Sequence, residues 1–277
     1  MLKSVNFVDS SCNSDLDEKP KKITKNKIII KQKSNNFVPD IVELNTKKEQ
    51  ANEINKPKLF FTPQKIPDFV DIKILKEYVK KDVDANKEYF DDTNSTYKIS
   101  NPTKAEWILN KSIKGGKMIG NGNTNVDINV NDKYGIDVSV LTLRGNHSNE
   151  KSVMQNFSGC NNLDSLFTEN KGDEAVKVFK DNLSKKYNFK DGIDKDILYL
   201  IFVCKEKNVY LTCLKLNLES VPNIKFSNFT KSKKTIQLDN CIDPKVGNVI
   251  LYKSKKRLEL RLHKDIINNN ECSVKVF

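Results

Sequence analysis

The stretch "DILYLIFVC" at Asp196–Cys204 constrains the fold more than any other, because it is an almost continuous apolar run of strand length. Such a run fits a strand that is covered on both faces of a sheet, since a strand with one solvated face alternates apolar and polar residues. The turn "KEKN" follows, and then "VYLTCLKLNL", which does alternate and therefore has one polar side. The sequence predicts a buried strand that turns into a second, half-exposed strand.

Helical patterns surround these strands. Apolar residues at helical spacing predict helices over residues 71–83, 101–114 and 172–187, and a short helix over 147–157 in "HSNEKSVMQNF". Ser100 or Asn101 can cap the second helix, Pro102 suits its first position, and Gly115-Gly116 ends it. Near the C-terminus, "GNVILYKSKKRLELRLH" predicts a hairpin. This order of elements indicates an α/β or α+β fold with a mixed central sheet flanked by helices.

The chain of 277 residues divides by composition into two parts. Residues 1–57 are rich in lysine and low in hydrophobicity, which predicts a basic, poorly ordered N-terminal arm. Residues 58–277 are expected to form one compact domain. The net charge of +12 and the pI near 9.2 favour a polyanionic partner, most simply a nucleic acid. A lysine-rich surface that only keeps the protein in solution is the alternative.

Several classes of protein are disfavoured. The six cysteines form no CxxC pair and no signal peptide is evident, so a reducing cytoplasm is the expected location. No apolar run approaches the roughly 18 residues of a membrane span, so no membrane association is expected. The two histidines, His147 and His263, lie far apart, and the sequence contains neither GxSxG nor a phosphate-binding glycine loop. Zinc chemistry, serine-type acyl transfer and nucleotide hydrolysis are therefore disfavoured.

The stretch "GNGNTNVDINVNDKYGIDVSVLTL", residues 120–143, predicts a β-hairpin with two acidic residues on its arms. A loop centred on Asp132 pairs residues whose numbers sum to 264, which places Asp127 opposite Asp137. Any even register puts both carboxylates on one face, because side chains alternate along a strand. The apolar neighbours Val126, Ile128, Ile136 and Val138 are expected to point the other way, toward a core.

Facing carboxylates repel each other, so the arrangement needs water, a nearby cationic side chain or a divalent ion. Hard cations such as Mg²⁺ prefer oxygen ligands and are often bound by one or two carboxylates together with substrate phosphate. A basic protein with a local acidic pair has the charge layout of a metal-dependent nuclease, in which the ion activates water and stabilises the leaving oxygen. A solvated polar hairpin is the alternative interpretation of the same residues.

The sequence "GNGNTNVDI…GIDVSVL", preceded by a helix that carries Glu106, resembles the core of the PD-(D/E)XK nuclease superfamily, which includes type II restriction endonucleases. The resemblance covers roughly residues 101–157. It implies a mixed sheet flanked by helices, hydrolysis of DNA phosphodiester bonds with Mg²⁺, and double-stranded DNA as partner. Glu106 resembles the helix acid of that family, Asp127 the motif aspartate, and Asp137 the second acid. Asp127 and Asp137 would be the metal ligands.

Ser139 stands where the family has a lysine that orients or helps to deprotonate the attacking water. A cation from elsewhere is then needed, and Lys117, Arg144 and Lys151 are the candidates. Glu150, Lys151 and Gln155, in the expected short helix, also resemble polar residues that the family places near the metal. The residues expected to contact nucleic acid are Arg144, Lys255, Lys256, Arg257 and Arg261.

The sequence leaves three functions open. The first is a Mg²⁺-dependent DNA endonuclease of restriction type, with Glu106, Asp127, Asp137, Ser139, Lys151 and Gln155 in the catalytic region. The second is a non-catalytic basic protein that binds nucleic acid. The third is a structural or interaction protein with a lysine-rich surface. The choice between DNA and RNA, the recognition sequence and the formation of a homodimer stay open as well.

Overall fold

The computed structural model describes residues 57–119, 126–143, 149–156, 163–187, 196–230, 234–252 and 257–277. For residues 149–156, Leu163 and Arg257 it describes the backbone and not the side chains. The expected arm lies outside the described residues except for Pro57, and so do Arg144, Lys255 and Lys256. Residues Asn55–Phe277 form one compact unit.

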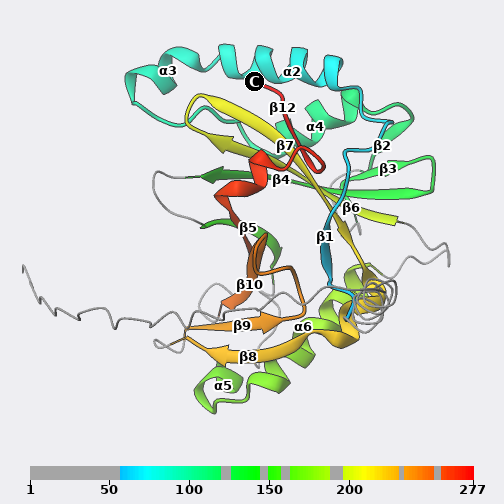
Figure 1. The fold of residues 1–277 in the computed structure, drawn as a ribbon, viewed down its shortest axis with the longest axis vertical. Coiled ribbons are helices and arrows are strands. Elements are labelled where there is room, and N and C mark those ends of the chain that lie inside the picture. Colours follow the sequence, from blue (N-terminus) through cyan, green and yellow to red (C-terminus); the bar gives the residue numbers. More distant parts are fainter. Residues whose placement is uncertain are drawn as a thin grey trace, which may run out of the picture. The chain divides into compact units, whose positions relative to one another are not determined.

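A mixed sheet of seven strands forms the centre of this unit (Figure 1). Its strands are β1 (Phe61–Pro63), β2 (Gly116–Met118), β3 (Ile128–Val130), β4 (Tyr134–Leu143), β6 (Asp196–Lys205), β7 (Asn208–Leu216) and β12 (Ser273–Lys275). The order is β1-β7-β6-β4-β3-β2, with β12 also paired to β7. Only the β4–β6 pair is parallel. The predicted mixed α/β fold is confirmed.

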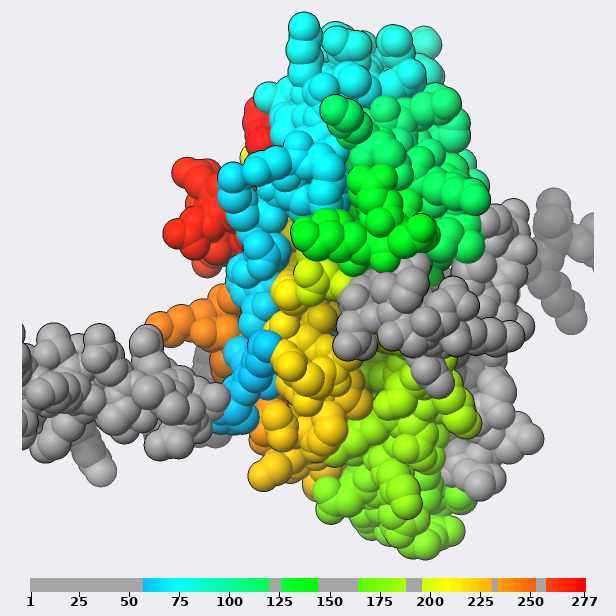
Figure 2. All heavy atoms as spheres, turned by 90° about the vertical axis from the view of Figure 1, so that its right-hand side faces the viewer, coloured from blue at the N-terminus to red at the C-terminus, as the bar shows by residue number. Residues whose placement is uncertain are grey.

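Strand β6 is the "DILYLIFVC" run, and its residues from Ile197 to Cys204 are all buried. It lies between β4 and β7, so both of its edges are paired and both of its faces are covered. Figure 2 shows the chain that contains β1 (blue) running alongside the yellow region of β6 and β7, as the β1–β7 pairing requires.

The helices begin where the sequence offers capping groups. They are α2 (Ile72–Asp84), α3 (Lys87–Asp92), α4 (Pro102–Ser112), α5 (Leu163–Thr168) and α6 (Gly172–Lys186), with 3₁₀ turns η1 (Leu218–Asn223) and η2 (Lys264–Asn268). The Asp71 side chain accepts from two backbone N–H groups at the start of α2. Asn101 does the same for Lys104 at the start of α4, and Pro102 follows it, as predicted. The helices predicted over 71–83, 101–114 and 172–187 are confirmed within a few residues.

Each face of the central sheet packs on its own hydrophobic cluster. Helices α2 and α4 cover the face that carries Ile128, Ile136 and Leu200. Helix α6 covers the opposite face, where Phe179 and Leu183 meet Tyr199 and other residues of β6. In Figure 1, α2 and α4 lie on one side of the sheet and α6 on the other. The connection from β4 to the parallel strand β6 contains β5, α5 and α6, and α6 is the helix that packs on the sheet as a crossover between parallel strands requires.

A second, antiparallel sheet of five strands was not expected. Its strands are β5 (Asn149–Asn156), β8 (Lys225–Phe229), β9 (Thr235–Asp239), β10 (Gly247–Tyr252) and β11 (Arg257–His263), in the order β5-β11-β10-β9-β8. The C-terminal hairpin was predicted correctly as β10 and β11, but it belongs to this sheet and not to the central one. Leu258, Leu260 and Leu262 of β11 share the cluster that contains α6.

The helix predicted over residues 147–157 is wrong, because residues 149–156 form the edge strand β5. Seven of its residues pair with β11, and the register shifts once between Leu258 and Glu259. A segment of this length satisfies its backbone groups more fully by pairing with an exposed strand edge than by forming two turns of isolated helix. The apolar residues Val153, Met154 and Phe157 have helical spacing, so the local pattern favoured a helix.

The helices in the described part of the chain are all too short or too polar to cross a membrane.

Candidate active site

The β3–β4 hairpin positions the two aspartates in the predicted register. Ile128 pairs with Ile136 and Val130 with Tyr134, so the loop is centred on Asp132. Asp132 and Asn131 have positive φ angles of 55° and 50°, which is how the chain reverses over three residues. One residue before β3, the Asp127 N–H donates to the Ile136 carbonyl at 2.9 Å. The pairing thus extends to Asp127 and brings it beside Asp137.

The Asp127 carboxylate lies against the backbone of β4. Its Oδ2 accepts a hydrogen bond from the Val138 N–H at 2.7 Å. Burial and the neighbouring charge of Asp137 raise the pKa of Asp127 from 3.8 to about 6, and the charge of Glu106 adds to this. The Val138 hydrogen bond and the charge of Lys186 act in the opposite direction. The raised pKa indicates a buried carboxyl group in a locally acidic environment.

Glu106 projects from the middle of α4 and is half-buried. Burial raises its pKa, and the charge of Asp137 raises it further. The three acidic residues singled out in the sequence therefore influence one another, although they come from a helix and from both strands of the hairpin.

Asp137 is 7% exposed. Two side chains hold its carboxylate: Lys186, the last residue of α6, and Tyr187, which follows it. Lys186 Nζ donates to Asp137 Oδ2 at 2.6 Å, and the Tyr187 hydroxyl donates to the same oxygen. Burial and the charge of Asp137 raise the pKa of Tyr187 well above its usual value, so the hydroxyl stays protonated and acts as a donor. The Lys186 ammonium lies 4.8 Å from the centre of the Tyr187 ring.

Lys186 was not among the predicted residues, yet it supplies a cation beside the two aspartates. Ser139 lies two residues after Asp137 on β4 and carries no charge. A signal for Lys186 did exist in the sequence. A crossover helix runs back along its two parallel strands, so the C-terminal end of α6 must lie near the beginning of β4, where Asp137 is.

The other predicted residues lie on strands where they are described, and the backbone of one of these strands, β5, contacts β4. Lys117 is an exposed residue of β2. Lys151 and Gln155 lie on β5, paired with Arg261 and Leu258 of β11, and not on a helix as expected.

The predicted nucleic-acid contacts lie on or near the second sheet where they are described. Arg261 donates to the Tyr252 hydroxyl at 3.0 Å, and its Nε lies 3.7 Å from the buried carboxylate of Glu259. Arg257 is described only as backbone of β11. Arg144, Lys255 and Lys256 lie outside the described residues, so their roles stay predictions.

Val126 departs from the expected orientation of the apolar neighbours. Ile128, Ile136 and Val138 pack on the cluster that contains α4, as predicted, but Val126 belongs to the opposite cluster. It covers Gly135, where an added Cβ would lie 2.8 Å from Val126 Cγ1. The chain bends at Asp127 before β3 begins, so the alternation does not continue to Val126. Val126 therefore forms an apolar wall on the aspartate face.

The two aspartates are suited to a hard divalent cation. In each carboxylate the hydrogen bonds described above use Oδ2, and Oδ1 is the oxygen that could coordinate a cation. Burial raises the pKa of Asp127 most, and the negative charge of Asp137 raises it further; a bound cation would offset this second cause. In the described residues no three histidine, cysteine or acidic side chains are close enough to hold one metal, so Glu106 does not join the pair as a third ligand here.

Comparisons with protein-family models, with curated proteins and with solved structures gave no match to this chain.

Proposed function

We propose that the protein is a Mg²⁺-dependent endonuclease that hydrolyses phosphodiester bonds of double-stranded DNA and is of restriction type. The observation that carries the proposal is the convergence of Asp127, Asp137 and Lys186 on one face of the hairpin, with Glu106 close enough to affect the pKa of Asp127. The order of helix α4, hairpin, crossover helix α6 and buried strand β6 supports the resemblance to the PD-(D/E)XK superfamily.

Asp127 and Asp137 would hold the ion, which supplies the positive charge that activates water and stabilises the leaving oxygen. The pKa of about 6 leaves Asp127 mostly ionised at neutral pH, so it can act as a ligand there. Bringing a cation close to Asp127 also removes the repulsion from Asp137.

Lys186 takes the place that Ser139 cannot fill. An ammonium has three N–H donors, and one of them bonds to Asp137. The others can orient an attacking water or contact a phosphate oxygen of the substrate. Tyr187 donates to the same carboxylate oxygen as Lys186, so it is a positioning residue and not a catalytic one. Glu106 contributes negative charge at the rim of the site.

The test is cleavage of unmodified plasmid with and without Mg²⁺, read on a gel. The proposal expects metal-dependent fragments that Asp127→Asn, Asp137→Asn and Lys186→Met each reduce by 100-fold or more. Lys185→Met is the matched control, because Lys185 is the exposed neighbour of Lys186 in the same turn of α6. Discrete fragments would support restriction, and a smear would indicate a nonspecific nuclease.

Folded protein that binds DNA without cleaving it under any divalent ion would contradict the proposal. That result would favour the non-catalytic nucleic-acid-binding protein. Full cleavage by Lys186→Met would instead overturn only the role given to this lysine.

A further inference from the structure

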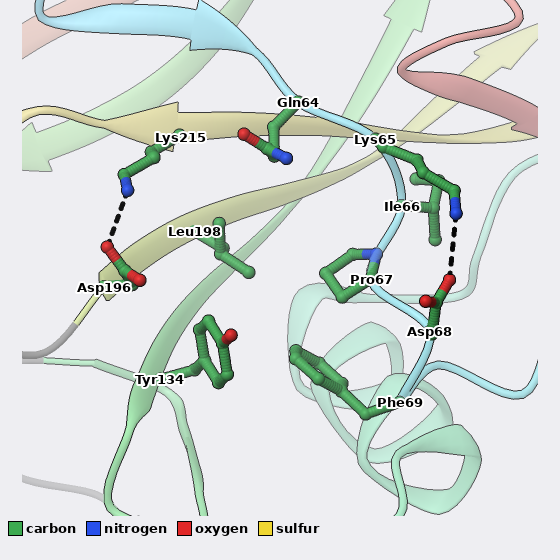
Figure 3. A pocket seen from close by; sticks show the side chains of 10 residues that line it. All are labelled: Gln64, Lys65, Ile66, Pro67, Asp68, Phe69, Tyr134, Asp196, Leu198 and Lys215. Atoms are coloured by element: carbon green, nitrogen blue, oxygen red, sulfur yellow. Dashed lines mark hydrogen bonds and ion pairs between the residues drawn. The ribbon is translucent and has the colours of Figure 1, made fainter.

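A pocket of about 380 Å³ opens on the face of the central sheet opposite to Asp137 (Figure 3). Its floor comes from the ends of three strands, with Tyr134 on β4, Leu198 on β6 and Lys215 on β7. Its wall is the segment of residues 64–69, which connects β1 to α2. This volume lies in the range of small-molecule sites, about 300–1,000 Å³.

The apolar part of the pocket is suited to a flat ring. The Phe69 and Tyr134 rings lie with their centres 5.1 Å apart and inclined by 48°. Both rings are half-buried, and Leu198 and Pro67 complete this side of the cavity. Figure 3 shows both rings and Leu198 directed toward the same space. Because the two rings contact each other, they form one continuous apolar wall with Leu198, against which one face of a planar ligand can stack.

The polar part of the pocket supplies donors and acceptors without net charge. Lys215 pairs with Asp196 at 2.6 Å. Lys65 pairs with Asp68 at 3.1 Å on the opposite rim. The two lysines are thus balanced by two aspartates, so the lining does not select an anion. The exposed amide of Gln64 adds one more donor and acceptor above the rings (Figure 3).

We propose that this pocket binds a nucleobase, either of a free nucleoside or of an unpaired nucleotide in a polynucleotide. A nucleobase is a flat, uncharged ring system whose edge carries both donors and acceptors. One of its faces can stack on the wall formed by Phe69, Tyr134 and Leu198, and its edge can pair with the polar groups of Lys215, Asp196 and Gln64. The site lies on the other face of the sheet from the aspartates and needs no cleavage activity.

Titration of the full chain with adenosine, guanosine, cytidine and uridine, followed by calorimetry and by saturation-transfer NMR, tests the proposal. At least one nucleoside is expected to bind, with inorganic phosphate and ribose giving no signal. Tyr134→Leu should weaken that binding at least tenfold while leaving the thermal unfolding midpoint within a few degrees. Tyr89→Leu, at a tyrosine of α3 that is 63% exposed, is the matched control and should change nothing.

Asp196→Asn is a second variant that leaves the rings intact. It frees the Lys215 ammonium, so a nucleoside monophosphate should bind several-fold more tightly than the nucleoside. The source of the base is distinguished with single-stranded oligonucleotides: tighter binding of an intact strand than of an abasic strand points to a polynucleotide, and equal binding points to a free nucleoside.

Absence of nucleoside binding, or equal binding by the native protein and Tyr134→Leu, would overturn this inference. Cleavage is measured separately on the same variants, and Asp127→Asn should leave nucleoside binding unchanged. Failure of the pocket proposal is therefore distinguishable from failure of the nuclease proposal.

Discussion

At the scale of single residues, Asp127 links the stability of the fold to the chemistry proposed for the site. Its pKa of about 6 lies well above the ordinary 3.8 because the carboxyl group is buried beside Asp137. Between those two pH values the folded protein holds a proton that the unfolded chain has released. Protonation of Asp127 therefore contributes to the stability of the folded protein. This contribution is fully present below about pH 4 and is lost as the pH rises through 6.

We therefore expect the metal-free protein to lose stability between pH 4 and 7 relative to Asp127→Asn, by at most about 3 kcal/mol. Urea unfolding at several pH values in EDTA measures the difference between the two proteins. Mg²⁺ at pH 7 should restore part of the loss in the native protein and none in the variant. A constant difference across this pH range would contradict the raised pKa.

Protons and Mg²⁺ should compete for Asp127 if it is a metal ligand. The acid limb of the cleavage profile, expected near pH 6, should then move to lower pH when the Mg²⁺ concentration is raised tenfold. Initial cleavage rates between pH 5 and 8 at two Mg²⁺ concentrations provide the measurement. A limb that does not move would show that Asp127 does not take up the proton that limits the rate.

Tyr187 donates a hydrogen bond to the buried carboxylate of Asp137. Tyr187→Phe removes one of the two side-chain donors to Asp137 and keeps the ring, so it should lower the free energy of unfolding by about 1–2 kcal/mol. Because Asp137 is then held only by Lys186, the Mg²⁺ concentration for half-maximal cleavage should rise several-fold. Tyr210→Phe, a half-buried tyrosine of β7, serves as control. A loss of stability without a change in Mg²⁺ dependence would mean that the hydroxyl has only a structural role.

At the scale of elements, the spacing of apolar residues and the capping residues were sufficient to predict the longer helices. Helices α2, α4 and α6 followed from apolar spacing and capping residues, and the hairpin register followed from a loop centred on Asp132. Strand β5 was mistaken for a helix because its adjacent apolar residues Val153 and Met154 do not alternate as in a regular strand. Its strand conformation comes from pairing with β11, which shifts register between Leu258 and Glu259. Lys186 was missed for a related reason, since its contact with Asp137 joins residues 49 positions apart.

At the same scale, Val126 packs closely against Gly135 on the aspartate face. A Cβ at residue 135 would lie 2.8 Å from Val126 and 2.9 Å from the Ile197 side chain. Gly135→Ala should therefore destabilise the fold by about 1–3 kcal/mol through overpacking. Val126→Ala should also destabilise it, by opening a cavity.

The double variant tests whether these two effects share one cause. Combining Gly135→Ala with Val126→Ala should cost less than the sum of the single changes, because the new methyl group fills the space that the valine leaves. Urea unfolding of the four proteins gives the coupling free energy. Additive effects would contradict direct contact between the two positions.

At the scale of the whole molecule, the sequence indicated the central mixed sheet but not the second one. Strands β8 and β9 have few features that separate them from loops. Pairing with β10 sets the place of β9, and pairing with β9 sets that of β8. The net charge follows directly from the sequence, and so does its division between the N-terminal residues and the rest of the chain. Residues 1–57 contain eleven lysines and eight acidic residues, so they carry only +3 of the net charge of +12.

Most of the electrostatic attraction for a nucleic acid should therefore reside in residues 58–277. A protein truncated to residues 55–277 corresponds to the compact unit and should keep the thermal unfolding midpoint of the full chain. Its affinity for duplex DNA should fall with salt almost as steeply as that of the full chain. The slope counts the phosphates that lysine and arginine neutralise, and 37 of the 48 lysines and arginines lie in residues 58–277. Fluorescence anisotropy with one labelled duplex at several salt concentrations measures both slopes. If truncation removed most of the salt dependence, the N-terminal residues would be the main contact with DNA, and the positive charge of the compact unit would have to serve another purpose.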